Sequence, residues 1–81
     1  MNTKKDIPDI VRQKAKGLID LYGINLDFIG MYRGMDVYEF HFPENTETGY
    51  PFLYLYDKLS NTATEVTGFE ALEIIEQLDK Y

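Results

Sequence analysis

Residues 37–57 read VYEFHFPENTETGYPFLYLYD, and aromatic side chains recur in this stretch at every second position. Such alternation is typical of β-strands, because successive side chains of a strand point to opposite faces of the sheet. The aromatic positions fall into two runs: Tyr38, Phe40 and Phe42, then Tyr50, Phe52, Tyr54 and Tyr56. Turn-forming residues 43–49 separate the two runs, so the stretch predicts a β-hairpin with an aromatic stripe on each strand.

The chain has 81 residues, a formal net charge of −6 and no cysteine. Its length predicts a single domain over residues 1–81 with a thin core, and we expect residues 1–6 to be a flexible start. The absence of cysteine excludes disulfides and is consistent with a reducing compartment. No stretch approaches the roughly 20 consecutive apolar residues of a membrane span, and no apolar segment follows Lys4 and Lys5. We therefore expect a cytoplasmic protein without membrane contact.

Toward the N-terminus, apolar residues at helical spacing predict a helix over residues 7–22. Asp6 is its predicted N-cap, and Gly23 stands where a left-handed residue commonly ends a helix. Residues 26–32 then predict a strand, and a turn leads from it into the strand of residues 37–42.

Toward the C-terminus, the strand of residues 50–56 is followed by a turn and a short strand over residues 62–66. The last helix is predicted to begin with a capping box, in which Thr67 is the N-cap and Glu70 lies three residues on. An apolar stripe at helical spacing follows the capping box: Phe69, Leu72, Ile75 and Leu78.

This order of elements predicts an α+β domain of the form α-β-β-β-(β)-α. Short connections favour an antiparallel meander of three or four strands. We expect the N-terminal and the C-terminal helix to pack on one face of this sheet, which would leave the other face open to solvent.

Two registers of the third strand are compatible with the sequence. We favour the one that turns the apolar pair Leu53 and Leu55 toward the helices, because the phenol groups of Tyr54 and Tyr56 can then reach water. The opposite parity would place the whole aromatic set in the core.

The favoured register leaves an aromatic surface on the open face of the sheet. Its predicted partner-binding residues are Phe52, Tyr54, Tyr56, Glu39 and His41. Aromatic residues are enriched at the centres of protein interfaces. We therefore expect a small non-catalytic interaction module that binds a protein partner, or a second copy of itself as a homodimer, through this face.

The sequence offers few residues for catalysis or metal binding. Glu39 and His41 share a strand face at a spacing that suits two metal ligands, but two ligands are too few. The chain has no cysteine nucleophile, and its one serine, Ser60, is remote in sequence from His41. Its glycines occur singly, so no loop is predicted to bind phosphate. We expect no enzymatic activity, no metal and no cofactor.

The distribution of charge bears on the kind of partner. Five of the basic side chains fall in the first sixteen residues and the remainder of the chain is acidic, which disfavours nucleic acid as a partner. Glu70, Glu73 and Glu76 form one ridge of the predicted last helix. Such a ridge is most often a solvated face; the alternative is an acidic inhibitor or nucleic-acid mimic that acts on a basic partner.

The strand pattern also resembles that of PepSY-type domains. A first strand over Val37–Phe42, a second strand that ends at Asp57 and a turn into a short strand at residues 61–66 follow an N-terminal helix, as in that family. The glycine usual in the last turn of the family is replaced here by Asn61-Thr62-Ala63. The resemblance implies the same topology. PepSY-type domains are typically extracytoplasmic and are thought to restrain peptidases or to bind small partners, so a PepSY-like peptidase-restraining module is a further alternative.

Overall fold

A computed structural model of the chain describes residues 7–43 and 50–78. The predicted flexible start, the Asp6 N-cap and most of the predicted hairpin loop lie outside these residues. The described elements, in chain order, are α1 (Asp9–Lys14), α2 (Lys16–Tyr22), β1 (Leu26–Tyr32), β2 (Met35–Phe40), β3 (Phe52–Asp57), β4 (Thr62–Thr67) and α3 (Phe69–Glu76).

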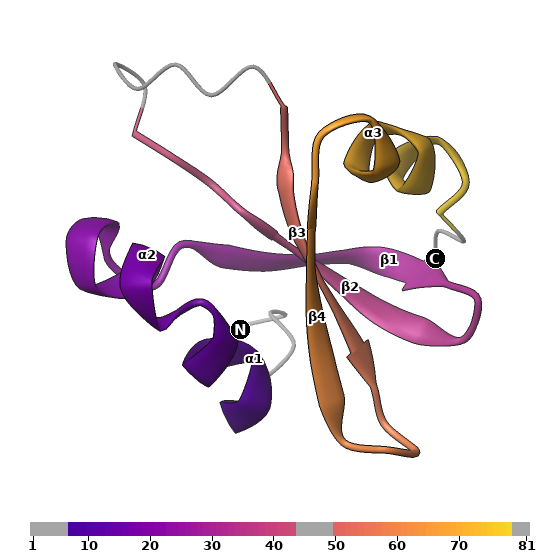
Figure 1. Cartoon of the computed structure of the whole chain (residues 1–81), viewed down its shortest axis with the longest axis horizontal. Helices are drawn as coiled ribbons and strands as arrows, with labels where there is room; N and C mark the ends of the chain where they lie inside the picture. The colour runs from indigo at the N-terminus through magenta and orange to yellow at the C-terminus, as the bar shows by residue number, and fades with distance from the viewer. Residues whose placement is uncertain (1–6, 44–49, 79–81) are drawn as a thin grey trace, which may run out of the picture.

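The strands form one antiparallel sheet in the order β1-β2-β3-β4, so each strand pairs with its neighbour in the chain (Figure 1). The predicted α+β class and antiparallel meander are confirmed, with the optional fourth strand present. Residues at the centre of the sheet pair directly, with Tyr38 opposite Tyr54 and Val37 opposite Leu55. Because adjacent positions on a strand face opposite sides, these pairs belong to two different faces.

Helices cover both faces of the sheet, and the prediction that they share one face is wrong. α1 and α2 lie on one side of the sheet and α3 lies on the other (Figure 1). The reason lies in the two central strands, β2 and β3, whose alternate residues are apolar on both sides. A sheet of this kind needs cover on each face, and each end of the chain supplies one layer.

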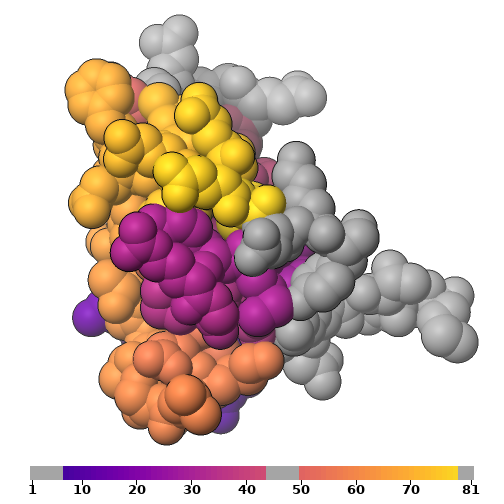
Figure 2. Space-filling view, turned by 90° about the vertical axis from the view of Figure 1, so that its right-hand side faces the viewer, coloured from indigo at the N-terminus to yellow at the C-terminus, as the bar shows by residue number. Residues whose placement is uncertain are grey.

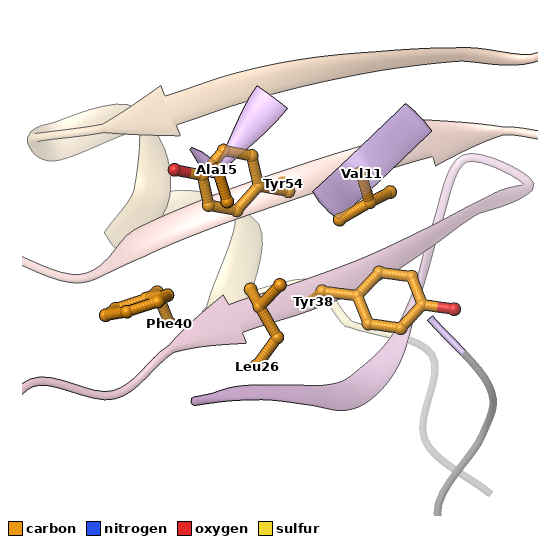
Figure 3. Close-up of a cluster of buried hydrophobic side chains, with 6 residues drawn as sticks. All are labelled: Val11, Ala15, Leu26, Tyr38, Phe40 and Tyr54. Atoms are coloured by element: carbon orange, nitrogen blue, oxygen red, sulfur yellow. The ribbon is translucent and has the colours of Figure 1, made fainter. Parts of the chain in front are cut away.

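The first core lies between the sheet and α1, and Figure 3 shows its fully buried members: Val11, Ala15, Leu26, Tyr38, Phe40 and Tyr54. Val11 and Ala15 are four residues apart, so they present one helical face to the sheet. At Ala15 the backbone departs from helical geometry (φ −92°, ψ 10°), which divides the predicted single helix into α1 and α2. Gly17, a weak helix former, lies two residues after this break.

The second core lies between the sheet and α3. Val37, Leu53 and Leu55 of the sheet pack against Ala71 and Ile74 of the helix, and all five side chains are buried. The prediction that Leu53 and Leu55 face a helix is therefore confirmed. That helix is α3 alone, because α1 and α2 occupy the aromatic face.

A β-bulge in β1 changes which residues share a face. The pairing of β1 with β2 shifts between Phe28 and Gly30, and Gly30 has a φ of 145°. Phe28 packs on the first core. An unbroken alternation would place Tyr32 on the same face as Phe28. Tyr32 packs on the second core instead, because the extra residue of the bulge reverses the alternation beyond it.

The start of α3 also differs from the prediction. Thr67 is the last residue of β4, and the N-cap position is taken by Gly68 (φ 79°, ψ −151°) without a side-chain cap hydrogen bond. The predicted capping box is thus wrong. The buried stripe is Ala71 and Ile74 rather than one that begins at Phe69, which points to solvent.

We expect two glycine substitutions to have opposite effects on the free energy of unfolding. Arg33 and Gly34 form the two-residue β1–β2 turn with φ values of 51° and 81°. Gly34→Ala should therefore lower the free energy of unfolding by about 1 kcal/mol. Gly17→Ala, in α2, should raise it by about 0.5–1 kcal/mol, since the new methyl group meets no atom within 4 Å. Urea unfolding of both variants measures the difference, and an equal effect of the two would contradict the assigned turn.

Candidate functional site

The aromatic residues predicted to form an open surface lie on the face that α1 and α2 cover. Tyr54 has an exposed fraction of 0% and belongs to the first core. Phe52 and Tyr56 are half-buried and pack against the same core. The predicted open aromatic face is therefore wrong, and the parity that places these side chains inside is the one the chain adopts.

Polar contacts at the edge of the sheet orient two of these tyrosines. The Tyr54 hydroxyl donates a hydrogen bond to Glu65 Oε2 at 2.7 Å, and the Tyr56 hydroxyl donates one to Asn61 Oδ1 at 3.2 Å. Both acceptors belong to β4 or to the turn before it. The phenol groups thus find acceptors within the fold, which explains how a tyrosine stripe can face a core.

Glu39 and His41 lie apart from the aromatic residues, on the face of the sheet that α3 covers. His41 Nε2 lies 2.9 Å from Asp27 Oδ2, and both side chains are about half exposed. Asp27 also stands opposite Glu39 in the β1–β2 pairing. The five predicted partner-binding residues are thus divided between two faces of the sheet, and Asp27 lies beside two of them.

These acidic and histidine side chains do not assemble a metal centre within the described ranges. Across residues 7–43 and 50–78, no group of three or more His, Cys, Asp and Glu side chains could hold a metal ion. The same residues contain no helix that is long and apolar enough to cross a membrane.

The carboxylate of Asp36 is buried, although the sequence predicted a turn at this position. Asp36 is the second residue of β2, has an exposed fraction of 1%, and lies 3.9 Å from Lys58 Nζ through its Oδ1 atom. Lys58 belongs to the β3–β4 turn. The alternation Asp36, Tyr38, Phe40 could have indicated that this carboxylate shares the covered aromatic face.

An exposed apolar cluster lies at the start of α3. It consists of Tyr50, Phe69 and Leu72, with exposed fractions of 38%, 74% and 39%, and we call it the α3 patch. The rings of Tyr50 and Phe69 meet edge to face with centroids 5.2 Å apart. Leu72 lies one helical turn beyond Phe69, so the two side chains share a side of the helix.

The local backbone explains why these apolar side chains point to solvent. Gly68 turns the chain sharply from β4 into α3, and Ala71 and Ile74 then anchor the helix on the second core. Successive residues of a helix are rotated by about 100° around its axis. Because Ala71 and Ile74 face the sheet, Phe69 and Leu72 point sideways and away from it. The sequence predicted these two residues to be core, so it could not reveal the patch.

Acidic residues border the α3 patch. Glu70 and Glu73 of α3 are exposed, and Glu76 continues the same acidic ridge one turn later. Figure 2 shows α3, in yellow, above the β1–β2 hairpin in magenta and the β3–β4 turn in orange. The surface around α3 thus combines aromatic and aliphatic groups with negative charge.

Other large apolar side chains are exposed away from the α3 patch. Leu59 is fully exposed, at 100%, in the β3–β4 turn, and Leu21 and Ile24 are exposed at and just beyond the end of α2. Single exposed apolar residues are normal in globular proteins. Leu59 is therefore a suitable control for substitutions within the patch.

We expect the environment of Tyr54 to make stability depend on alkaline pH. Burial, with the hydrogen bond to Glu65, raises the pKa of the Tyr54 phenol. Below the ordinary value of about 10 the phenol is protonated in both the folded and the unfolded chain; at higher pH the unfolded chain loses this proton first, so the free energy of unfolding falls. Urea unfolding at pH 9 and pH 11 (about one unit either side of that value) measures this fall.

The matched control for this pH dependence is Tyr54→Phe, which removes only the titrating hydroxyl. The fall in stability between the two pH values should be smaller in this variant. An identical fall in both proteins would show that Tyr54 does not contribute to it.

No family model, no curated protein and no solved structure matches this chain. The resemblance to PepSY-type domains therefore stays a prediction, and the functional argument rests on the surface of the chain itself.

Proposed function

We propose that this chain is a small non-catalytic protein-interaction module that binds its partner through the α3 patch. The observation that supports this proposal is the 74% exposure of Phe69, a large aromatic side chain held in place by its contact with Tyr50. Aromatic side chains at the centre of an interface commonly dominate the binding energy. The patch thus takes the role that the sequence suggested for the face of the sheet.

The charges around the α3 patch favour a partner with a basic rim. Glu70 and Glu73 lie beside Phe69 and Leu72 on the same helix, and the chain carries a net charge of −6. In an interface of this kind the apolar centre provides affinity, while the charged rim mainly affects the rate of association and the choice of partner.

The test of this proposal is affinity capture from cells in which the chain is produced, with the wild type and Phe69→Ser compared in parallel. A protein that binds the patch should be enriched by the wild type and lose binding by about tenfold or more with Phe69→Ser, since removal of a central aromatic anchor commonly costs 2 kcal/mol or more. Leu59→Ser is the matched control, because it removes a fully exposed apolar side chain outside the patch. Proteins captured equally by all three would contradict the proposal.

A second candidate function is an acidic inhibitor or nucleic-acid mimic that acts on a basic partner. The observation that favours it is the exposed ridge of Glu70, Glu73 and Glu76 on α3. Salt separates the two candidates, because contacts between exposed charges are screened whereas an apolar centre is not. If capture depends on the ridge, Glu73→Gln and higher salt should weaken it while Phe69→Ser should leave it unchanged.

A further inference from the structure

The outer edge of β4 is an accessible strand edge. β4 is the last strand of the sheet and pairs only with β3 among the described residues. In Figure 1 it runs in front of the other strands, between α1 and α2 on one side and α3 on the other, and no helix is drawn over it. Its outward N–H and C=O groups can therefore pair with a further strand.

β4 lacks three of the devices that commonly prevent edge pairing, and its one charged side chain is Glu65. Its sequence, TATEVT, contains no proline and no lysine, and its pairing with β3 continues over six residues without a bulge. The opposite edge of the sheet differs, because β1 carries a bulge at Phe28–Gly30. Bulges and edge lysines protect sheets from association, so β4 is the edge that remains open to pairing.

We propose that two copies of this chain associate through β4 in an antiparallel pair, and that their sheets join into one of eight strands. The two-fold axis lies at Thr64. A two-fold axis perpendicular to the sheet makes the two β4 strands antiparallel and keeps the same face of each sheet on the same side. Each residue of β4 therefore stands opposite a residue of the second copy whose side chain points to the same face.

The sequence of β4 selects this register. The two-fold axis passes through one residue of β4. Five residues of Thr62–Thr67 pair with β4 of the second copy only if that residue is Thr64 or Glu65. A centre at Glu65 would set the two Glu65 carboxylates directly opposite each other, which is destabilising. A centre at Thr64 sets Thr64 opposite Thr64, Glu65 opposite Ala63 and Val66 opposite Thr62, with no like charges opposed.

This arrangement does not involve the α3 patch, so the inference is independent of the proposed function. The perpendicular axis places α1 and α2 of both copies on one face of the joined sheet and α3 of both copies on the other. The acidic ridges of the two α3 helices then lie on the same face, and the net charge of −6 opposes association. We therefore expect salt to strengthen the dimer, because it screens this repulsion.

The first test is the molar mass of the full chain by light scattering after size exclusion, from about 10 µM to about 1 mM, the range of weak, small interfaces. The mass should rise toward that of a dimer with concentration. Thr64→Lys, which sets two lysines opposite each other, should remove this rise. Gln77→Lys adds the same charge just after α3 and should leave the rise unchanged. A monomer at every concentration, or a dimer that persists in Thr64→Lys, would overturn the inference.

The second test examines the register through disulfide formation, since the native chain has no cysteine. In the proposed dimer the two copies of Thr64 are directly opposed, whereas the two copies of Thr67 lie six residues apart along the strands, about 20 Å. Under mild oxidation, Thr64→Cys should form a covalent dimer about tenfold faster than Thr67→Cys, because disulfides require Cβ atoms about 4 Å apart. Equal rates for the two variants would exclude the Thr64-centred pairing.

Discussion

Replacement of Tyr54 by alanine is expected to lower the free energy of unfolding by about 3–5 kcal/mol. Tyr54 is fully buried between β3 and α1, in contact with the cluster that includes Val11 and Ala15 (Figure 3). Truncation removes the buried ring and leaves a cavity beneath the helix. A domain of this size has a total stability of roughly 4–12 kcal/mol, so the substitution should remove a large part of it.

Tyr54→Phe is the control for this substitution, since it keeps the ring and removes only the hydroxyl. Loss of the hydrogen bond to Glu65 should cost about 1 kcal/mol, because Glu65 is exposed and can bind water instead. Urea unfolding followed by circular dichroism measures both variants. A cost below about 1 kcal/mol for Tyr54→Ala would mean that the ring lies on the surface.

Leu53→Ala is expected to lower the free energy of unfolding by about 2–5 kcal/mol, although Leu53 is the immediate neighbour of Tyr54 and points to the opposite face. Leu53 is fully buried and packs in the second core with Ala71 and Ile74 of α3. The comparison is informative because a sheet covered on one face only would tolerate one of the two substitutions.

The matched control for Leu53→Ala is Leu59→Ala, in the β3–β4 turn, where the same side chain is fully exposed. Its effect should lie within about 0.5 kcal/mol of zero. Thermal or urea unfolding of the three proteins gives the comparison. Similar stabilities of Leu53→Ala and Leu59→Ala would contradict the presence of a core beneath α3.

Two-sided burial of the sheet has a direct consequence for function. The face of a sheet that carries Tyr38, Phe40 and Tyr54 provides the interior of the domain, so it cannot also provide a binding surface in the folded state. Among the described residues, the two surfaces proposed above for recognition, the α3 patch and the edge of β4, lie outside this interior. The first offers apolar and acidic side chains, and the second offers backbone hydrogen bonds.

Much of the fold follows from local patterns in the sequence. Period-two alternation located the strands, and Gly23 stands at the end of α2 with a φ of 94°, as its position predicted. These features depend on neighbours along the chain, so they are accessible without tertiary information. The four-stranded meander follows from them because the connections between successive strands are too short for a helical crossover to a parallel strand.

The distribution of the helices over the two faces could not be predicted in the same way. The strand Phe52–Tyr56 is apolar on both faces. Hydrophobicity alone therefore does not determine which helix covers which face. The preference for exposed tyrosine hydroxyls misled the prediction, because Tyr54 meets an acceptor, Glu65, that only the pairing of β3 with β4 brings into reach.

The candidate surface was missed for a related reason. Phe69 and Leu72 have the spacing of a core stripe, and the capping box at Thr67 supported that interpretation. In the fold, Thr67 completes β4 and Gly68 makes the turn, so the helix begins after the predicted cap with another side inward. The side of a short helix that faces a sheet thus depends on the conformation of the turn before the helix.

The two-sided core can be tested most directly by nuclear Overhauser effects between side chains of the isotope-labelled full chain. We predict cross-peaks from the Tyr54 ring to the methyl groups of Val11 and Ala15, and from the Leu53 methyl groups to those of Ala71 and Ile74. Cross-peaks from Leu53 to Val11, or a Tyr54 ring without contact to α1, would contradict the assignment of one helical layer to each face of the sheet.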